Sequence, residues 1–462
     1  MNFYSFKDPD AQVFRVNGQF FRKIHRNFVE EFTDFVDSGL YQELIDQKLI
    51  IPHQEIQSDL NSYEFPLLIK PKQLIYHVLP FEWSEQMWFE CNRTCLQINI
   101  IALKFGFILK DATPYNYTYY EGKMCMFDSS SFIRFNEGNP WFAYRQYCEE
   151  MLGPYLLIKY KGAEWSKFGI SSLRGYNLKF IASHLPFRSK FNLLALIHIH
   201  LHKNFSNNQL ALDKKNENKS VFTIKTFQSF LESIYLNFSE SLTKRLGHWQ
   251  RYYKDFLESD GYLIAKKEII TDWITNLGVK SITDLGANVG EFSFLASSMV
   301  ERVLAIEADP TCVDEIINHI SAKEIKNVYP AMMDLTQVSP DLGNNLAEYT
   351  NIFSRGKSEM VFALALVHHL AISYSFSFNH IFTLLSQFTS RYLIVEFIDK
   401  SDEKVQILLQ NKRNNFEWYD CENFENSCKI NFNIFEKVVI PNSKRILYLV
   451  EKINDINSTQ NN

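Results

Sequence analysis

The chain has no paired cysteines, no membrane-length apolar run and no large excess of one charge. Its seven cysteines form no C-x-x-C pair, are scattered and are odd in number, which favours reduced thiols in a cytosol over a disulfide framework. The longest apolar stretch in the middle of the chain, residues 191–200, is too short to span a bilayer. A net charge of −5 argues against general binding to nucleic acid or anionic membranes.

The first ten residues carry charge where a secretory signal needs an apolar core, and we found no internal repeats. With 46% hydrophobic and 22% charged residues, the sequence is typical of a soluble globular protein, and we expect it in the cytoplasm. A chain of 462 residues is too long for one ordinary core. We expect an α+β domain over 1–150, a mostly helical extension over 151–245, an α/β domain over 246–453 and a disordered tail over 454–462.

The most informative segment is SITDLGANVGEFSFL, residues 281–295, which reads as a short strand, a turn and an amphipathic helix. Gly286 and Gly290 let the backbone turn sharply and approach a ligand, while the helix directs free N–H groups at the same place. The next strand, 303–306, ends in Glu307, whose carboxylate can accept both hydroxyls of a ribose. Pyrophosphate cradles use G-x-G-x-x-G, so this spacing better fits a ligand with a ribose and no phosphate.

Further apolar runs continue the same plan. Residues 328–333 and 360–367 are typical of buried parallel strands, the first followed by Asp334 and the second by His368 and His369. A strand over 391–395 ends in Glu396. Two last runs, 432–440 and 444–450, are separated by Pro-Asn-Ser and predict a closing antiparallel hairpin.

The D-L-G-x-x-x-G pattern with Glu307 in register resembles motif I and its acidic follower in class I S-adenosyl-L-methionine-dependent methyltransferases. The longer strings DLGANVGEFS, LALVHHLAIS, LIVEFIDKSDEKVQILL and FEWYDCENFE resemble a bacterial methyltransferase group that includes the NoeA-type host-specificity nodulation proteins. These matches cover about residues 245–450. The resemblance implies a Rossmann-like, seven-stranded α/β sheet with a C-terminal antiparallel hairpin, and S-adenosyl-L-methionine as the cofactor.

The resemblance also implies roles for single residues. The acid of motif I lies near the methionine moiety, the glycines border the nucleoside, the acid after the second strand holds the ribose, and the acid after the third contacts the adenine amine. The predicted cofactor-binding residues are Asp284, Gly286, Ala287, Asn288, Gly290, Glu307, Ala308, Asp309, Asp334 and Leu366. No metal site is predicted.

The catalytic candidates are His368 and His369, because a histidine beside the methyl donor can take the proton from the nucleophile. Alternatively, one ring caps the strand or packs on the adenine while the other points into the sheet. Glu396 is a weaker candidate base. The chain lacks the Asn-Pro-Pro-Tyr type of tetrapeptide found in many amino-group methyltransferases, which favours an oxygen acceptor, a small-molecule or glycan-like hydroxyl.

Upstream of this domain, Trp249 and Tyr253 are four residues apart and would share one helix face. With the helix-like run 263–270 they predict a lid over the cofactor. Simple packing explains such an aromatic pair better than a cage for the sulfonium does, although a cation is attracted to an aromatic face.

The first half of the chain is richer in aromatic residues. It shows β-like runs at 12–16 and 19–24, a further possible strand at 74–79 and helical spacing over 83–105. In the following hairpin, Asp111, Asn116 and Asp128 have the spacing of a kinase catalytic loop and metal-binding acid. The neighbouring residues depart from the kinase pattern and no glycine-rich phosphate loop is present, so Asp111 and Asn116 can equally cap a turn.

Further along, the histidines at 198, 200 and 202 would share one side of a strand, as metal ligands do, but no cysteine or carboxylate completes the set. The polar run 203–220 reads as a linker and 221–253 as helical. Two other functions stay open beside methyl transfer. One is a non-catalytic regulator or scaffold that binds S-adenosyl-L-methionine, and the other is a phosphotransferase acting through Asp111. The sequence predicts no particular oligomeric state.

Overall fold

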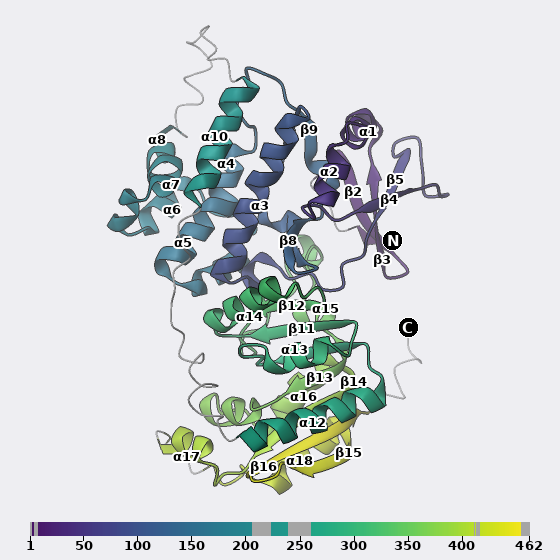
Figure 1. Ribbon diagram of the computed structural model, residues 1–462, viewed down its shortest axis with the longest axis vertical. Coiled ribbons are helices and arrows are strands. Elements are labelled where there is room, and N and C mark those ends of the chain that lie inside the picture. The colour runs from purple at the N-terminus through teal and green to yellow at the C-terminus, as the bar shows by residue number, and fades with distance from the viewer. Residues whose placement is uncertain are drawn as a thin grey trace. The chain divides into compact units, whose positions relative to one another are not determined.

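The computed structural model describes residues 2–3, 8–205, 223–238, 260–410, 412 and 416–453 (Figure 1). The chain divides into two compact units, one of residues 1–245 with 341–349 and one of residues 246–340 with 350–462. We call them the N-terminal and C-terminal units. Within the described ranges, no helix has both the length and the apolar composition of a membrane span. Trp249 and Tyr253 of the predicted lid and the predicted tail over 454–462 lie outside the described residues, whereas the lid's helix-like run 263–270 is helical as expected.

The C-terminal unit is built on a seven-stranded sheet in the order β12-β11-β10-β13-β14-β16-β15. Neighbouring strands from β12 to β14 run parallel, whereas β16 pairs antiparallel with both β14 and β15. The predicted mixed sheet with a closing hairpin is therefore confirmed. The strands are β10 (Ser281–Leu285), β11 (Arg302–Glu307), β12 (Val328–Met332), β13 (Ser358–Ala363), β14 (Thr389–Ile398), β15 (Phe432–Val439) and β16 (Arg445–Lys452).

The parallel strands are buried on both faces, which explains their near-continuous apolar sequences. Polar side chains cap the N-termini of helices that connect these strands. Asp309 caps α14, for example, by accepting a hydrogen bond from the amide of Thr311. The helices of this unit are α12 (Asp260–Leu277), α13 (Glu291–Ser297), α14 (Pro310–Lys323), α15 (Ile352–Arg355), α16 (Phe378–Phe388), α17 (Glu403–Gln410) and α18 (Cys421–Asn431), with the short turn η10 (His369–Ser373). The short turn η9 (Asn344–Leu346) lies in the segment 341–349, which belongs to the N-terminal unit.

Two predicted boundaries in this unit were wrong. The strand expected over 360–367 ends at Ala363, because the chain turns there and Ala365 adopts a φ of 49°. The strand expected over 391–395 continues to Ile398, so Glu396 lies inside β14 and not after its end. The partner strand β16 pairs with β14 as far as Ile398, and this pairing holds the extra residues in the sheet.

The N-terminal unit opens with a five-stranded antiparallel sheet in the order β1-β2-β3-β5-β4. The strands are β1 (Asn2–Phe3), β2 (Ala11–Val16), β3 (Gln19–Ile24), β4 (His53–Ile56) and β5 (Leu67–Pro71), with η1 (Arg26–Phe28), α1 (Val29–Asp37) and α2 (Leu40–Asp46) between β3 and β4. The strands expected near 12–16 and 19–24 are confirmed. The strand expected over 74–79 was wrong, since that segment is irregular and β5 precedes it.

The long helix α3 (Glu85–Lys104) confirms the prediction for 83–105, and Ser84 caps it by accepting from the amide of Met87. Two small antiparallel pairs follow, β6 (Phe107–Leu109) with β9 (Phe132–Arg134) and β7 (Tyr117–Tyr120) with β8 (Lys123–Met126). The remaining elements are helical: η2 (Pro80–Glu82), η3 (Pro114–Asn116), η4 (Ser129–Ser131), α4 (Tyr144–Gln146), η5 (Tyr147–Leu152), α5 (Gly153–Lys161), η6 (Ala163–Ile170), α6 (Leu178–His184), η7 (Phe187–Phe191), α7 (Leu193–Ala195), η8 (Leu196–Leu201), α8 (His202–Phe205) and α10 (Ile224–Asn237).

Candidate cofactor site

The predicted cofactor residues gather at one edge of the C-terminal sheet. Strands β10 to β13 run parallel, so the loops that follow them leave the same edge, where open α/β sheets bind their ligands. Asp284 lies near the end of β10 and Glu307 ends β11, while Asp334 and Leu366 follow β12 and β13. The prediction that these residues bind S-adenosyl-L-methionine rests on this convergence and stays a prediction for each residue.

The loop after β10 turns tightly on its two glycines. The amides of Gly286 and Ala287 both donate to the carbonyl of Ile306, at 2.9 and 3.0 Å, which fastens the loop to β11. Gly286 and Gly290 have φ values of 76° and 86°, in the left-handed region that other residues rarely adopt. A Cβ at position 290 would lie 2.7 Å from the ring of Phe294 and 3.1 Å from Ile316. Glycine is therefore required here by both conformation and space.

The half-buried carboxylate of Glu307 lies against this loop. Its Oε2 accepts from the amide of Asn288 at 2.7 Å, and its Oε1 accepts from the amides of Ala308 and Asp309 at 2.7 and 2.9 Å. Burial raises the pKa of Glu307, and the three amides counteract that rise. An ionised carboxylate has about four acceptor positions, so one remains for a ribose hydroxyl and a second becomes available if one amide bond is exchanged. These residues fit the nucleoside of the predicted cofactor.

The other two strand-end acids of the predicted set, Asp284 and Asp334, each accept a hydrogen bond from a hydroxyl side chain. Asp284 is only 3% exposed, and its Oδ2 accepts from the hydroxyl of Ser293 at 2.6 Å. Burial raises the pKa of Asp284 to about 6, so this carboxyl group titrates close to neutral pH. Asp334 accepts from the amide and the hydroxyl of Thr336 at 2.8 and 2.7 Å, which orders the turn after β12. Ser293, which holds Asp284, was missed because only the fold shows that this side chain turns back onto the strand.

The two catalytic candidates lie side by side after β13. The ring centroids of His368 and His369 are 4.1 Å apart. His368 is 1% exposed, and neither ring nitrogen has a hydrogen-bond partner among the described residues. Burial lowers the pKa of His368 well below its ordinary value and that of His369 to about 4. Both imidazoles are therefore neutral at pH 7 and able to accept a proton.

Glu396, the weaker candidate base, is fully buried and engaged on both oxygens. Its Oε2 accepts from Lys266 Nζ and from the amide of Ala365, both at 2.7 Å, and its Oε1 accepts from the hydroxyl of Tyr262 at 2.7 Å. Although burial alone would raise the pKa of Glu396, Lys266 and Arg445 hold it below its ordinary value. Such a carboxylate makes a poor base, and its bond to Ala365 anchors the turn that leads to the two histidines.

Little in the sequence signals this network. Lys266 lies in α12 and is followed by Lys267 and Glu268, and Arg445 is the first residue of β16 and follows Lys444. Arg445 Nη1 is 3.8 Å from Glu396 Oε1. Because charged residues adjoin both cations in the chain, no local pattern marks either of them as buried. The partners themselves are far apart in the chain, so their pairing was not predictable.

In the N-terminal unit, two of the three kinase-like residues, Asp128 and Asn116, are bonded to other side chains. Arg22 pairs with Asp128, which also accepts from the amide and hydroxyl of Ser130 and the hydroxyl of Ser131. Asn116 donates to the Ser131 hydroxyl at 3.4 Å. An arginine thus takes the place at Asp128 that a kinase gives to a metal ion. The kinase-like reading of this unit is not shown and stays a prediction.

The three histidines near residue 200 do not share a strand face, because η8 and α8 make this segment helical. His198 is hydrogen-bonded to the Tyr144 hydroxyl at 2.6 Å, and His200 to the Ser189 hydroxyl at 2.8 Å. Across the described part of the chain, no group of three or more His, Cys, Asp or Glu residues is placed to hold a metal ion.

No protein-family model matches the chain. Nodulation protein NoeA of Rhizobium meliloti (strain 1021) is 25% identical over 464 residues, covering 97% of this chain and 95% of NoeA. The N-methyltransferase NodS of Bradyrhizobium japonicum WM9, solved in complex with S-adenosyl-L-homocysteine, is 10% identical over 45% of this chain and 97% of NodS, with a TM-score of 0.34. Magnesium protoporphyrin IX methyltransferase of Synechocystis PCC 6803, solved with bound S-adenosyl-L-homocysteine, is 18% identical over 44% of this chain and 93% of the enzyme, with a TM-score of 0.31.

The match to NoeA extends over nearly the whole of both chains and includes the N-terminal half, which the sequence motifs did not cover. The C-terminal unit adds the seven-stranded sheet, the closing hairpin and the glycine loop that motif I requires. The predicted seven-stranded sheet agrees with the structure. The chain is similar to the nodulation protein NoeA over nearly its whole length, and its C-terminal unit has the seven-stranded sheet that a class I S-adenosyl-L-methionine-dependent methyltransferase domain is expected to have.

Proposed function

We propose that the C-terminal unit transfers a methyl group from S-adenosyl-L-methionine to a hydroxyl of a small-molecule or glycan-like acceptor. The observation that carries the proposal is the contact between Glu307 and the amide of Asn288, which sets a ribose-binding carboxylate beside the glycine loop. The cofactor supplies an activated methyl group on a sulfonium. The remaining work of the protein is to bind both reactants and to align them.

The residues divide this work between them. Glu307 holds the ribose, the 286–290 loop approaches the nucleoside through its backbone, and Asp334 contacts the adenine. Asp284, held by Ser293, lies near the methionine moiety. His369 is half-buried and His368 is fully buried, so His369 is the better placed of the two to accept the hydroxyl proton. Glu396 is a positioning residue, because it holds the turn at Ala365.

For the whole chain, we propose that residues 1–150 and 151–245 form the recognition part and 246–453 the methyltransferase, with 454–462 as a tail. The absence of an Asn-Pro-Pro-Tyr type of tetrapeptide supports an oxygen acceptor over an amino group.

The test uses the full chain, the cofactor with a labelled methyl group and a fractionated lysate of the source organism. We expect one fraction of small molecules or glycans to acquire the label while S-adenosyl-L-homocysteine accumulates. Label in a protein or nucleic-acid fraction would overturn the proposed acceptor class. Binding of the cofactor with no S-adenosyl-L-homocysteine formed on any fraction would favour the non-catalytic regulator.

A further inference from the structure

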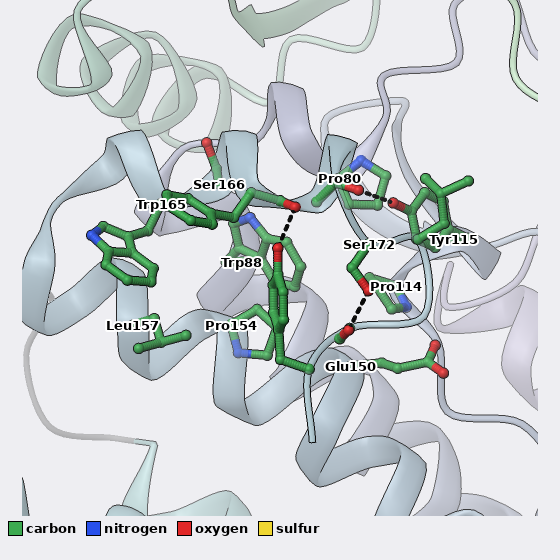
Figure 2. A pocket seen from close by; sticks show the side chains of 15 residues that line it. Pro80, Trp88, Pro114, Tyr115, Glu150, Pro154, Leu157, Trp165, Ser166 and Ser172 are labelled. Carbon is green, nitrogen blue, oxygen red and sulfur yellow. Dashed lines mark hydrogen bonds between the residues drawn. The ribbon is translucent and has the colours of Figure 1, made fainter. Parts of the chain in front are cut away.

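Five of the fifteen residues that line a cavity in the N-terminal unit are aromatic (Figure 2). Trp88, Tyr115, Trp165, Phe168 and Tyr176 line it together with Glu150, and we call these six residues the aromatic cage. The space between the walls is about 440 Å³ when the open solvent at its mouth is counted, and the room within it for the centres of water-sized molecules is about 30 Å³. Figure 2 shows Glu150 at the same end of the cavity as Pro114 and Tyr115, with Trp165 and Leu157 at the other end.

Among the described residues, Glu150 is the only one with a carboxyl side chain that lines this cavity. It hydrogen-bonds with Thr113 and Gln146, which are both neutral. The neighbouring Glu149 is paired with Arg145 at 3.1 Å, whereas no ion pair from a described lysine, arginine or histidine reaches Glu150. Burial raises the pKa of Glu150 to about 7, and the charges of Asp111 and Glu149 add to the rise. The cage therefore holds a carboxyl group that has no cation to balance its charge.

The cavity wall also contains polar atoms without partners. Trp88 is 3% exposed and Ser166 is 2% exposed, and neither the Trp88 indole N–H nor the Ser166 hydroxyl has a hydrogen-bond partner among the residues that the structure describes. Unpaired polar groups in a buried wall are unfavourable, and a ligand is one way to satisfy them. An apolar cavity with a few polar groups is the usual form of a small-molecule site.

We propose that the aromatic cage binds an organic ammonium ion, with the cation against the aromatic faces and paired with the carboxylate of Glu150. Aromatic rings attract cations through their negative faces, the attraction grows when the cation is desolvated, and quaternary ammonium groups are typical ligands of aromatic cages. A neutral ring compound could stack on the same walls but would leave the carboxyl group unbalanced. The ammonium group can belong to a free amine or to a lysine side chain of another protein, since the recognised chemistry is the same.

The proposal predicts a pH dependence. A bound cation favours the ionised carboxylate, so binding should strengthen as the pH rises through about 7 and weaken below it. The groups facing Glu150 are Thr113 and Gln146 as hydrogen-bond partners, Asp111 and Glu149 as acids, and the phenols of Tyr115 and Tyr349. Asp111 also has its pKa raised by burial, and its ionisation would act in the same direction.

The test is isothermal titration of the full chain with choline and with 3,3-dimethylbutan-1-ol, which has the same shape but no charge. A second arm compares choline with the amide of Nα-acetyl-trimethyllysine, to separate a free amine from a lysine side chain. We expect choline or the lysine derivative to bind at least tenfold more tightly than the neutral alcohol. Equal binding of choline and the alcohol, or no binding of either ammonium compound, would overturn the proposal.

Variants of two neighbouring acids sharpen the result. Glu150→Gln should weaken ammonium binding at least tenfold and abolish its pH dependence, while Glu149→Gln, outside the cage, should change it less than twofold. A circular dichroism spectrum and melting curve check that each variant folds. Should Glu150→Gln not fold, the choline and alcohol pair on the unaltered protein still decides the question. Magnesium binding that Glu150→Gln removes, with no ammonium binding, would replace the proposal with a metal site.

Discussion

The two units of this protein build their candidate sites from different materials. In the C-terminal unit the site is made largely of backbone, with glycines at positions 286 and 290 and amides that fix the carboxylate of Glu307. In the N-terminal unit the cage is made of side chains from α3, from η3, and from the stretch that runs from Glu150 to Tyr176. A backbone site leaves a short, ordered signature in the sequence, whereas a side-chain site is dispersed over it.

The buried ion pairs of the two units show the opposite contrast, because the supporting partners are distant in the C-terminal unit and local in the N-terminal unit. Glu396 depends on a lysine, an arginine, a tyrosine and one backbone amide, while Asp128 has one arginine and three hydrogen bonds from the serines that follow it. The local serines give Asp128 a partial replacement for its cation. Glu396 has no such local support, so the removal of a cation should harm the C-terminal unit more.

The largest effect is expected for Lys266→Met. This change leaves a buried carboxylate without its nearest cation and should lower the free energy of unfolding of the C-terminal unit by about 3–5 kcal/mol. The matched change in the other unit, Arg22→Met, should lower it by about 1–3 kcal/mol, because the serines still hydrogen-bond Asp128. Hydrogen exchange in urea measures both units separately. Equal losses would mean that the serines contribute nothing.

The second prediction concerns the cofactor. Glu307→Ala removes the two charge-assisted hydrogen bonds that we propose this carboxylate accepts from the ribose, at about 1.5 kcal/mol each. The affinity for S-adenosyl-L-methionine should therefore fall by about 3 kcal/mol, or roughly a hundredfold or more in Kd. Glu301→Ala is the control, since Glu301 is exposed and precedes the opposite end of β11. Calorimetry that finds the same affinity in Glu307→Ala and in the unaltered protein would remove the ribose role.

The third prediction compares two glycines of the C-terminal unit. Gly290→Ala places a methyl group in contact with Phe294 at a left-handed φ and should destabilise the unit by about 1–3 kcal/mol. Gly261→Ala lies in α12 with open space around it and should change stability by less than about 1 kcal/mol, in the favourable direction. Thermal unfolding measures both. A tolerated Gly290→Ala would show that the loop can rearrange.

The smallest effect is expected from pH. The pKa of His369 is lowered to about 4 and that of His368 lies well below its ordinary value, so both rings are neutral between pH 6 and 8. A base that must be neutral is then fully active across this range, and the rate of methyl transfer should be level there. It should fall only when the pH approaches 4. A rate profile with an inflection near 6.5 would show that the acting histidine is solvated in the complex.

Prediction from the sequence succeeded where the residues of one short segment determine its local structure. The residues from Asp284 to Gly290 encode a strand end, a turn and a helix start, and the apolar runs around them could only be buried strands. It failed where partners are distant, as for Lys266 with Glu396, or where an apolar run allowed two structures, as for the strand expected over 74–79. The cage was missed because aromatic residues are common in this half of the chain, and none of them marks a cavity by itself.

The segment 341–349 lies in the chain between β12 and β13 but belongs to the N-terminal unit, where Tyr349 packs on Tyr115 with ring centroids 4.9 Å apart. The polypeptide therefore passes between the units three times: near 245, near 340 and near 350. Recombination at a single breakpoint in the gene cannot exchange either unit intact. Such a protein is expected to be inherited whole, and the near end-to-end match with NoeA agrees with descent as one piece.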